Sequence, residues 1–229
     1  MYVFKEYKNQ KTLFTSLSEL IVDELLFALR NKRIVTLAVP GGTTPTPLFH
    51  ALSLAKIEWN RVVVIPTDER CVTGESHLSN SRLIRNNLLI NRAKKASFSE
   101  FFIPDISPNE MAAAGSKKLK DILPIDVCVL GMGTDMHTAS IFPDADRLSD
   151  ALSSESSDIL IPISSPTVAE MRLTLSATVL KSACRLHLIF TGLDKKAAFL
   201  ESLNKKSYLE APVKAIIDRE GETLVHYSN

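Results

Sequence analysis

The residues best placed to do chemistry lie in one short segment, residues 131–143. Here an acid, Asp135, and an imidazole, His137, stand two residues apart behind two glycines, and hydroxyl-bearing residues follow. A neutral imidazole takes a proton from water near physiological pH, and a neighbouring carboxylate orients the ring or raises its basicity. The segment therefore favours general-base activation of water by His137. A purely structural loop histidine is the alternative that the segment alone leaves open.

Other catalytic chemistries have little support. No serine lies in a Gly-x-Ser-x-Gly pattern and Cys71 has no base nearby in sequence, so covalent catalysis is not indicated. One Asp and one His are too few ligands for a metal site, and His-Glu-x-x-His is missing from the chain. We therefore expect no metal.

A second candidate site is the glycine-hydroxyl loop formed by Gly41, Gly42, Thr43 and Thr44, between an apolar strand-like run and a helix-like run. Backbone N–H groups and a helix N-terminus in such a loop can face an anion, and the hydroxyls add donors. The loop matches neither a dinucleotide-binding nor a Walker pattern, so it favours a simple phosphate ester over a nucleotide. A plain glycine turn is equally compatible with the loop by itself.

Basic residues at three other points complete the candidate set. Asp68, Glu69 and Arg70 follow an apolar run and are hard to bury, so they must lie at a sheet edge or in a polar cleft. Arg70 can clamp a phosphate or a developing oxyanion, with one carboxylate holding it in place. Arg172 opens a strand-like alternation, and Lys195 falls in the first turn of a helix, where a cation makes better sense beside an anion. Taken singly, each of these is also compatible with an ordinary solvated surface charge.

The elements that must position these residues alternate between strand and helix, which is the pattern of a doubly wound, mostly parallel α/β sheet with helices on both faces. We expect strands at 34–39, 62–65, 127–130, 159–163, 172–175, 185–191 and 223–227, and helices at 15–30, 48–54, 79–90, 111–122, 177–183 and 194–203. Ser79 or Asn80 is expected to cap the third helix. Because each candidate site follows a strand, we expect all of them to open on the same edge of the sheet, with a phosphate held some ångströms from His137.

Composition sets outer limits. With 229 residues, 45% of them hydrophobic, the chain is expected to form a single domain, 1–229, around one sizeable core. Its 27 basic and 26 acidic residues leave a net charge of +1, which argues against a nucleic-acid or anionic-membrane partner, and we expect a monomer or a weak homo-oligomer. The charged first residues do not look like a signal peptide, and three cysteines without Cys-x-x-Cys spacing do not suggest disulfides, so we expect a cytoplasmic protein.

Together these residues resemble the 6-phosphogluconolactonase family, which shares a superfamily with the glucosamine-6-phosphate deaminases. The matching motifs run in family order along nearly the whole chain: Pro40-Gly-Gly-Thr-Thr-Pro45, Asp68-Glu-Arg70, Ser79-Asn80, the block from Leu130 to Pro143, Arg172-Leu-Thr174 and Gly192-Leu-Asp-Lys195. The resemblance implies a three-layer α/β fold and no obligatory cofactor. It also implies hydrolysis of 6-phospho-D-glucono-1,5-lactone to 6-phospho-D-gluconate, the second step of the pentose phosphate pathway.

The resemblance further assigns roles. His137 would deprotonate the attacking water, Asp135 would orient the imidazole, and Arg70 with backbone N–H groups would stabilise the oxyanion. The substrate and its phosphate would be held by Gly41, Gly42, Thr43, Thr44, Asp68, Arg172 and Lys195.

Two differences separate the chain from the deaminase branch. Where the deaminase pattern has Asp-Glu-Tyr, this chain has Arg70 in the third position. After His137 it continues Thr-Ala-Ser-Ile-Phe-Pro, without the Asn-Glu that supplies acids for ring opening. These differences favour the lactonase over the deaminase or isomerase.

One departure concerns the His137 loop itself. The family usually has glycine between the acid and the histidine, and this chain has Met136. If that position needs φ > 0, methionine costs roughly 1–2 kcal/mol, and its side chain is expected close to the substrate. That expectation suggests a second hypothesis, a sugar-phosphate-binding sensor that has lost turnover. In addition, Pro40 stands where the family usually has serine, which removes one hydroxyl and one N–H donor.

Overall fold

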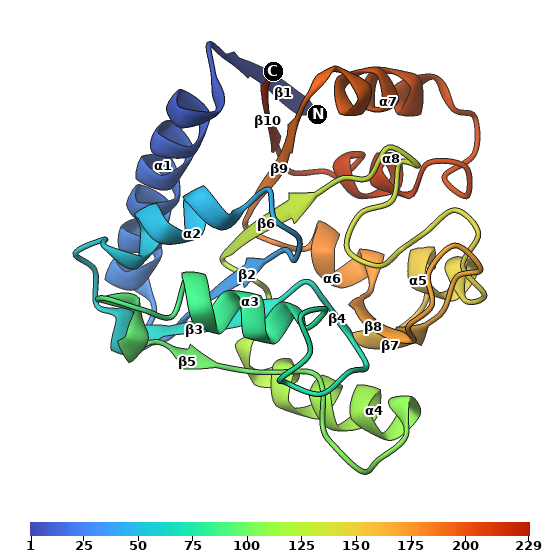
Figure 1. The fold of residues 1–229 in the computed structure, drawn as a ribbon, viewed down its shortest axis with the longest axis horizontal. Coiled ribbons are helices and arrows are strands. Elements are labelled where there is room, and N and C mark those ends of the chain that lie inside the picture. Colours follow the sequence, from blue (N-terminus) through green and yellow to red (C-terminus); the bar gives the residue numbers. More distant parts are fainter.

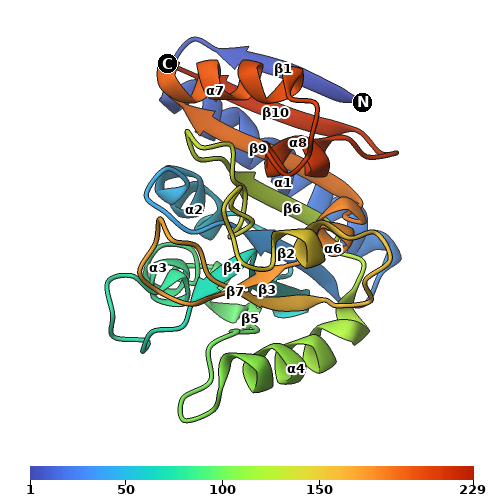
Figure 2. The same cartoon turned by 90° about the vertical axis from the view of Figure 1, so that its right-hand side faces the viewer.

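The structure, a computed structural model, describes all 229 residues of the chain. Its main sheet consists of β1 (Tyr2–Tyr7), β10 (Thr223–Ser228), β9 (Arg185–Thr191), β6 (Val127–Gly131), β2 (Val35–Val39), β3 (Val62–Pro66) and β5 (Ser97–Phe98). The strands are given in their order across the sheet, every neighbouring pair is parallel, and Figure 2 shows them from top to bottom. The first and last strands of the chain, β1 and β10, lie side by side (Figure 1). Because they are parallel, the N-terminus and the C-terminus lie at opposite ends of this pair (Figure 2).

Helices cover both faces of this sheet. They are α1 (Gln10–Asn31), α2 (Thr46–Ser53), α3 (Asn80–Asn87), α4 (Pro108–Leu119), α5 (Leu148–Leu152), α6 (Ala177–Lys181), α7 (Leu193–Asn204) and α8 (Pro212–Ile217). In Figure 1, α1 and α2 lie on one side of the sheet, and α5, α6 and α8 lie on the other. This three-layer arrangement confirms the doubly wound α/β fold expected from the sequence.

Strand β6 shows why the sheet must be covered on both faces. Val127 and Val129 pack into the cluster formed with α1 and α2, whereas Cys128 and Leu130 pack into the cluster on the opposite face. All four side chains are buried, because successive strand residues point to opposite faces and both are covered. An uninterrupted apolar run is therefore what this central strand requires.

The order of the strands creates the place for a site. From β2 the chain moves outward through β3 to β5, then returns to lay β6 on the other side of β2 and continues outward through β9 and β10. The loops that follow β2 and β6 consequently leave the sheet in opposite directions and open a crevice at the carboxyl ends of these two strands. Ligands of doubly wound folds bind at such a switch point.

A small antiparallel sheet lies beside the main one and consists of β4 (Asp68–Arg70), β8 (Arg172–Leu175) and β7 (Leu160–Ile163), in that order. The expectation that every site residue follows a strand is wrong for Arg172, which is the first residue of β8. Residues 68–70 form β4 rather than a loop. Antiparallel pairing places Arg172 directly opposite Arg70, so the start of one strand meets the end of the other.

Several other boundaries differ from the expected ones. Helix α1 begins at Gln10 because the side chain of Asn9 accepts a hydrogen bond from the Thr12 N–H and caps it. Strand β1 was not expected from its charged segment, but it lies at the edge of the sheet, where charged side chains remain in water. The short elements β5, α5 and α8 were also missed. None of the helices is long and apolar enough to cross a bilayer.

Candidate active site

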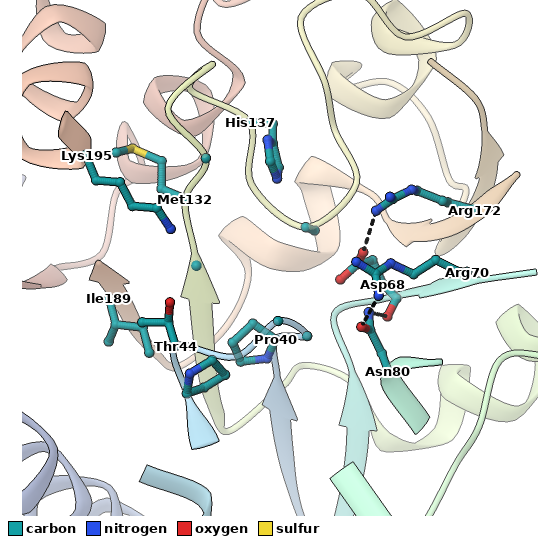
Figure 3. Close-up of a pocket in the computed structure, with 16 residues that line it drawn as sticks. Pro40, Thr44, Asp68, Arg70, Asn80, Met132, His137, Arg172, Ile189 and Lys195 are labelled. Atoms are coloured by element: carbon teal, nitrogen blue, oxygen red, sulfur yellow. Dashed lines mark hydrogen bonds and ion pairs between the residues drawn. The ribbon is translucent and has the colours of Figure 1, made fainter. Parts of the chain in front are cut away.

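A polar cavity of about 170 Å³ opens at the switch point between β2 and β6. Figure 3 shows the residues around it, which come from both sheets and from the start of α7. The lining residues are Pro40, Gly41, Gly42, Thr44, Pro45, Asp68, Arg70, Asn80, Gly131, Met132, Gly133, His137, Ala139, Arg172, Ile189 and Lys195. The expected convergence of the candidate sites is therefore observed, although it takes two sheets to achieve it.

The glycine-hydroxyl loop forms the floor of the cavity after β2. A Cβ atom at Gly41 would lie 1.9 Å from the Asn80 Oδ1, so only glycine allows this close approach. Gly42 has φ +81°, a conformation that glycine adopts without strain. Thr44 lines the cavity, but Thr43, which was expected to bind phosphate, is exposed and lies outside the lining.

His137 points into the cavity from the loop after β6 (Figure 3). Its Nδ1 lies 2.5 Å from the Asp135 Oδ1, and because the carboxylate only accepts, this hydrogen bond selects the tautomer with the proton on Nδ1. Nε2 is then left as a proton acceptor. Burial raises the pKa of the Asp135 carboxyl, but its hydrogen bonds and charge interaction with His137 outweigh that effect and lower it below the usual value.

Gly133 gives the imidazole its room. A Cβ atom there would lie 2.3 Å from both the His137 Nδ1 and the Asp135 Oδ1, far inside van der Waals contact. The turn is closed by two backbone hydrogen bonds, from the Gly133 N–H to the His137 carbonyl (3.1 Å) and from the Met136 N–H to the Gly133 carbonyl (3.1 Å). The acid and the histidine are thus held against each other by the turn itself.

Met136 does adopt the left-handed conformation, with φ +68°. The expectation that its side chain lies close to the substrate is wrong, however, because the side chain is only 7% exposed and packs into the hydrophobic core. The Met136 carbonyl also accepts a hydrogen bond from the Val213 N–H at 3.0 Å, which ties the loop to α8. Met136 therefore holds the loop against the hydrophobic core. The sensor hypothesis rested on a methionine side chain beside the substrate, and that premise does not hold.

Strand β4 presents its charged residues in different directions. Glu69 is buried and accepts hydrogen bonds from the backbone N–H groups of Arg70, Asn80 and Ser81, so it joins β4 to the start of α3. Its burial raises the pKa of this carboxyl, and the hydrogen bonds oppose the rise. Arg70 lines the cavity, with its Nη1 donating to the Leu78 carbonyl (2.6 Å) and to the Asn80 Oδ1 (3.0 Å).

Asn80 lines the cavity, although it was expected only as a possible helix cap and as part of the Ser79-Asn80 motif, without a role in the site. Ser79 is the cap, since its hydroxyl accepts from the Arg82 N–H, and Asn80 instead faces the cavity. Its side chain accepts from Arg70 and donates to the Asp68 carbonyl at 2.8 Å. The signal in the sequence was the Ser79-Asn80 pair, which is one of the motifs by which the chain resembles the 6-phosphogluconolactonase family.

Arg172 is 8% exposed, and this burial is the main reason that the pKa of its guanidinium is lowered. The positive charge of Arg70 lowers the pKa further, and the negative charge of Asp68 opposes the change. The closest approach between Arg172 and Asp68 is 3.9 Å, from Nη1 to Oδ2. Two guanidinium groups on paired strands repel each other, so a bound anion would stabilise this side of the cavity. Asp68 supplies part of that compensation.

Lys195 lies on the other side of His137 from Arg70 and Arg172, in the first turn of α7 (Figure 3). The pKa of its ammonium group is lowered by burial, and the negative charge of Asp135 offsets only part of that change. Of the residues predicted for the site, Asp135 and Thr43 alone lie outside the lining, and Asp135 is hydrogen-bonded to His137, which lines it.

Comparison with known proteins assigns the family. Residues 8–225 match the sequence profile described as "Glucosamine-6-phosphate isomerases/6-phosphogluconolactonase". The chain belongs to this family. Among curated members, a 6-phosphogluconolactonase from Mesorhizobium japonicum is 37% identical over 95% of this chain and 91% of its own length. Another from Pseudomonas aeruginosa is 37% identical over 86% of this chain and 83% of its own length.

Solved structures of family members agree with this assignment. The crystal structure of a 6-phosphogluconolactonase from Shewanella baltica has a TM-score of 0.96 and 30% identity, covering 100% of this chain and 98% of that one. A monomeric glucosamine-6-phosphate deaminase, 14% identical, has a TM-score of 0.81 over 99% of this chain and 97% of its own, a likeness that extends to the fold alone.

Proposed function

We propose that this member of the family hydrolyses 6-phospho-D-glucono-1,5-lactone to 6-phospho-D-gluconate, the second step of the oxidative pentose phosphate pathway. The observation that carries the proposal is the hydrogen bond of 2.5 Å between Asp135 and His137, whose imidazole lines a cavity that also contains basic side chains. The curated relatives of the chain are named 6-phosphogluconolactonases. A lactone phosphate needs both a base for water and an anion site, and the cavity offers both.

In this proposal the free Nε2 of His137 takes a proton from water as the water oxygen bonds to the lactone carbonyl carbon. The carbonyl oxygen becomes an oxyanion, which Arg70 and backbone N–H groups would stabilise. When the tetrahedral intermediate collapses, the bond to the ring oxygen breaks. That oxygen leaves with the proton held by His137, and the product carboxylic acid ionises. Asp135 keeps the imidazole in the required tautomer and stabilises its charged form.

We assign the 6-phosphate to Arg172, Lys195 and the loop of Gly41, Gly42 and Thr44. This loop presents backbone N–H groups ahead of α2, and Asp68 contributes by balancing the charge of Arg172. Thr43 stays in the proposed set only if the loop turns its exposed side chain inward when the phosphate binds. Holding the phosphate fixes the lactone ring against His137.

The test is a hydrolysis assay with freshly generated lactone, corrected for its spontaneous hydrolysis. We expect His137→Ala to lower kcat by about 10²- to 10⁴-fold, the usual contribution of a positioned general base. His50→Ala is the matched control, because His50 lies exposed on α2 outside the cavity, and it should retain full activity. A His137→Ala enzyme that works at the rate of the unaltered chain would refute the proposed mechanism.

We also propose that residues 1–229 act as one domain, in the cytoplasm, as a monomer or a weak homo-oligomer and without a nucleic-acid or membrane partner. The net charge of +1 and the three cysteines, all of which are free, support this setting. Sedimentation equilibrium across a range of protein concentrations would measure the association state directly.

A further inference from the structure

The segment that follows His137 connects it to Arg172 through Ser140. The Ser140 side chain is fully buried; its hydroxyl donates to the Asp68 Oδ2 at 2.5 Å and accepts from the Arg172 Nη1 at 3.4 Å. The direct distance from Nη1 to Oδ2, 3.9 Å, is too long for a hydrogen bond. The hydroxyl is therefore the hydrogen-bonding link between this carboxylate and this guanidinium.

The backbone of Ser140 reaches the same strand. Its N–H donates to the Thr174 Oγ1 at 3.3 Å, and Thr174 lies two residues beyond Arg172 on β8, on the same face of the strand. Ser140 is thus attached to β8 by both its backbone and its side chain. Since it is the third residue after His137, little chain separates this attachment from the base.

Phe142 makes a second connection between the same two residues. Its ring centroid lies 4.3 Å from that of His137, and the Arg172 Cζ lies 5.1 Å from its centre. The ring is 4% exposed, so the cation–π contact is made away from bulk water, where it is strongest. One aromatic ring therefore packs against both the base and the guanidinium.

We propose that Ser140 and Phe142 are positioning residues that hold Arg172 at a set distance from His137. Arg172 needs such support because it faces the like charge of Arg70, and its Nε has no hydrogen-bond partner in the protein. Without Ser140 and Phe142, repulsion would turn the guanidinium away from the position that an anion requires. This inference rests on the proposed function, because it assumes that His137 and Arg172 act on the same substrate. It adds how the distance between these two residues is maintained.

The decisive experiment is a double-mutant cycle between Ser140→Ala and Arg172→Met. We expect Ser140→Ala to weaken the binding of inorganic phosphate, measured by calorimetry, by about tenfold, the scale of one lost hydrogen bond to a charged group. We expect a similar loss in kcat/KM, carried mainly by KM. In the Arg172→Met background, Ser140→Ala should have no further effect on kcat/KM, because it acts through Arg172.

Phe142→Leu is the second variant, and it should show the same loss and the same dependence on Arg172. Ser165→Ala is the matched control, since Ser165 also donates from a buried hydroxyl to a carboxylate, Asp144 at 2.7 Å, but neither residue lines the cavity. It should leave phosphate binding and kcat/KM unchanged.

The proposal is overturned if Ser140→Ala binds phosphate as the unaltered chain does, or if its loss adds in full to that of Arg172→Met. Phosphate binding is measured without substrate turnover. A chain that binds phosphate but hydrolyses no lactone would therefore refute the proposed function, while calorimetry on the same variants would still decide the role of Ser140.

Discussion

Replacing Met136 by glycine and by alanine sets two opposite effects against each other. Met136 has φ +68°, which costs an L-residue roughly 1–2 kcal/mol, so glycine would relieve strain. Glycine also gains freedom in the unfolded chain, which offsets roughly 0.5–1 kcal/mol of that relief. Against this stands the side chain, 7% exposed in the core, whose removal costs about 2–5 kcal/mol.

Burial should win. We expect Met136→Gly to lower the free energy of unfolding by about 2–4 kcal/mol, and Met136→Ala to be less stable still by about 1 kcal/mol, because alanine keeps the strain. Urea unfolding of the three proteins measures both differences through the midpoint, provided that the slope is unchanged.

Activity supplies the second readout. Because Met136 lines no part of the cavity, the folded Met136→Gly protein should keep a kcat/KM close to that of the unaltered chain. A glycine variant at least as stable as the original would show that the side chain contributes no useful packing. An alanine variant more stable than the glycine variant would refute the assignment of strain at this position.

Three further predictions concern other residues. Gly133→Ala would force a methyl group within 2.3 Å of the His137 and Asp135 side chains, so we expect kcat to fall by about 10²-fold with the circular dichroism spectrum unchanged. The pKa of Asp135 is lowered in the folded state, so its stabilising effect is full above the ordinary carboxyl pKa and is lost as pH falls through the lower folded value. Asp135→Asn should therefore be less stable than the unaltered chain at pH 7, and the difference should shrink in acid unfolding measurements as pH falls below the ordinary carboxyl pKa. Among the thiols, exposed Cys184 should react first with a thiol reagent at pH 8, because burial raises the pKa of the other two to about 11 and, for Cys128, about 12; rapid labelling of Cys128 in the folded protein would contradict this.

Much of the fold follows from local pattern. The central strands are mostly apolar because both faces of a parallel sheet are covered, and β8 and β9 begin and end where the pattern predicts. Weakly patterned elements were not predicted, such as the edge strand β1, which has three exposed and three partly buried residues and no regular alternation between them. The short α5 and α8 carry too few turns for a helical period to show.

The candidate site divides in the same way. The chemistry of His137, Asp135, Arg70 and the glycine loop is legible in the sequence because it depends on residue type and on neighbours a few positions away. The direction in which Met136 points is not, since the sequence predicts that position's backbone but not which side of the loop is core.

The tertiary structure alone decided how distant segments meet. Strand β4 pairs antiparallel with β8, so Arg70 faces Arg172 across a sheet that the periodicity of either segment does not reveal. Ser140 bridges Asp68 and Arg172 for the same reason, although it is far from both in sequence. Residue types determine which reactions are possible here, while pairing between remote segments sets the distances, because hydrogen bonds and charge interactions depend on positions that only the packed chain defines.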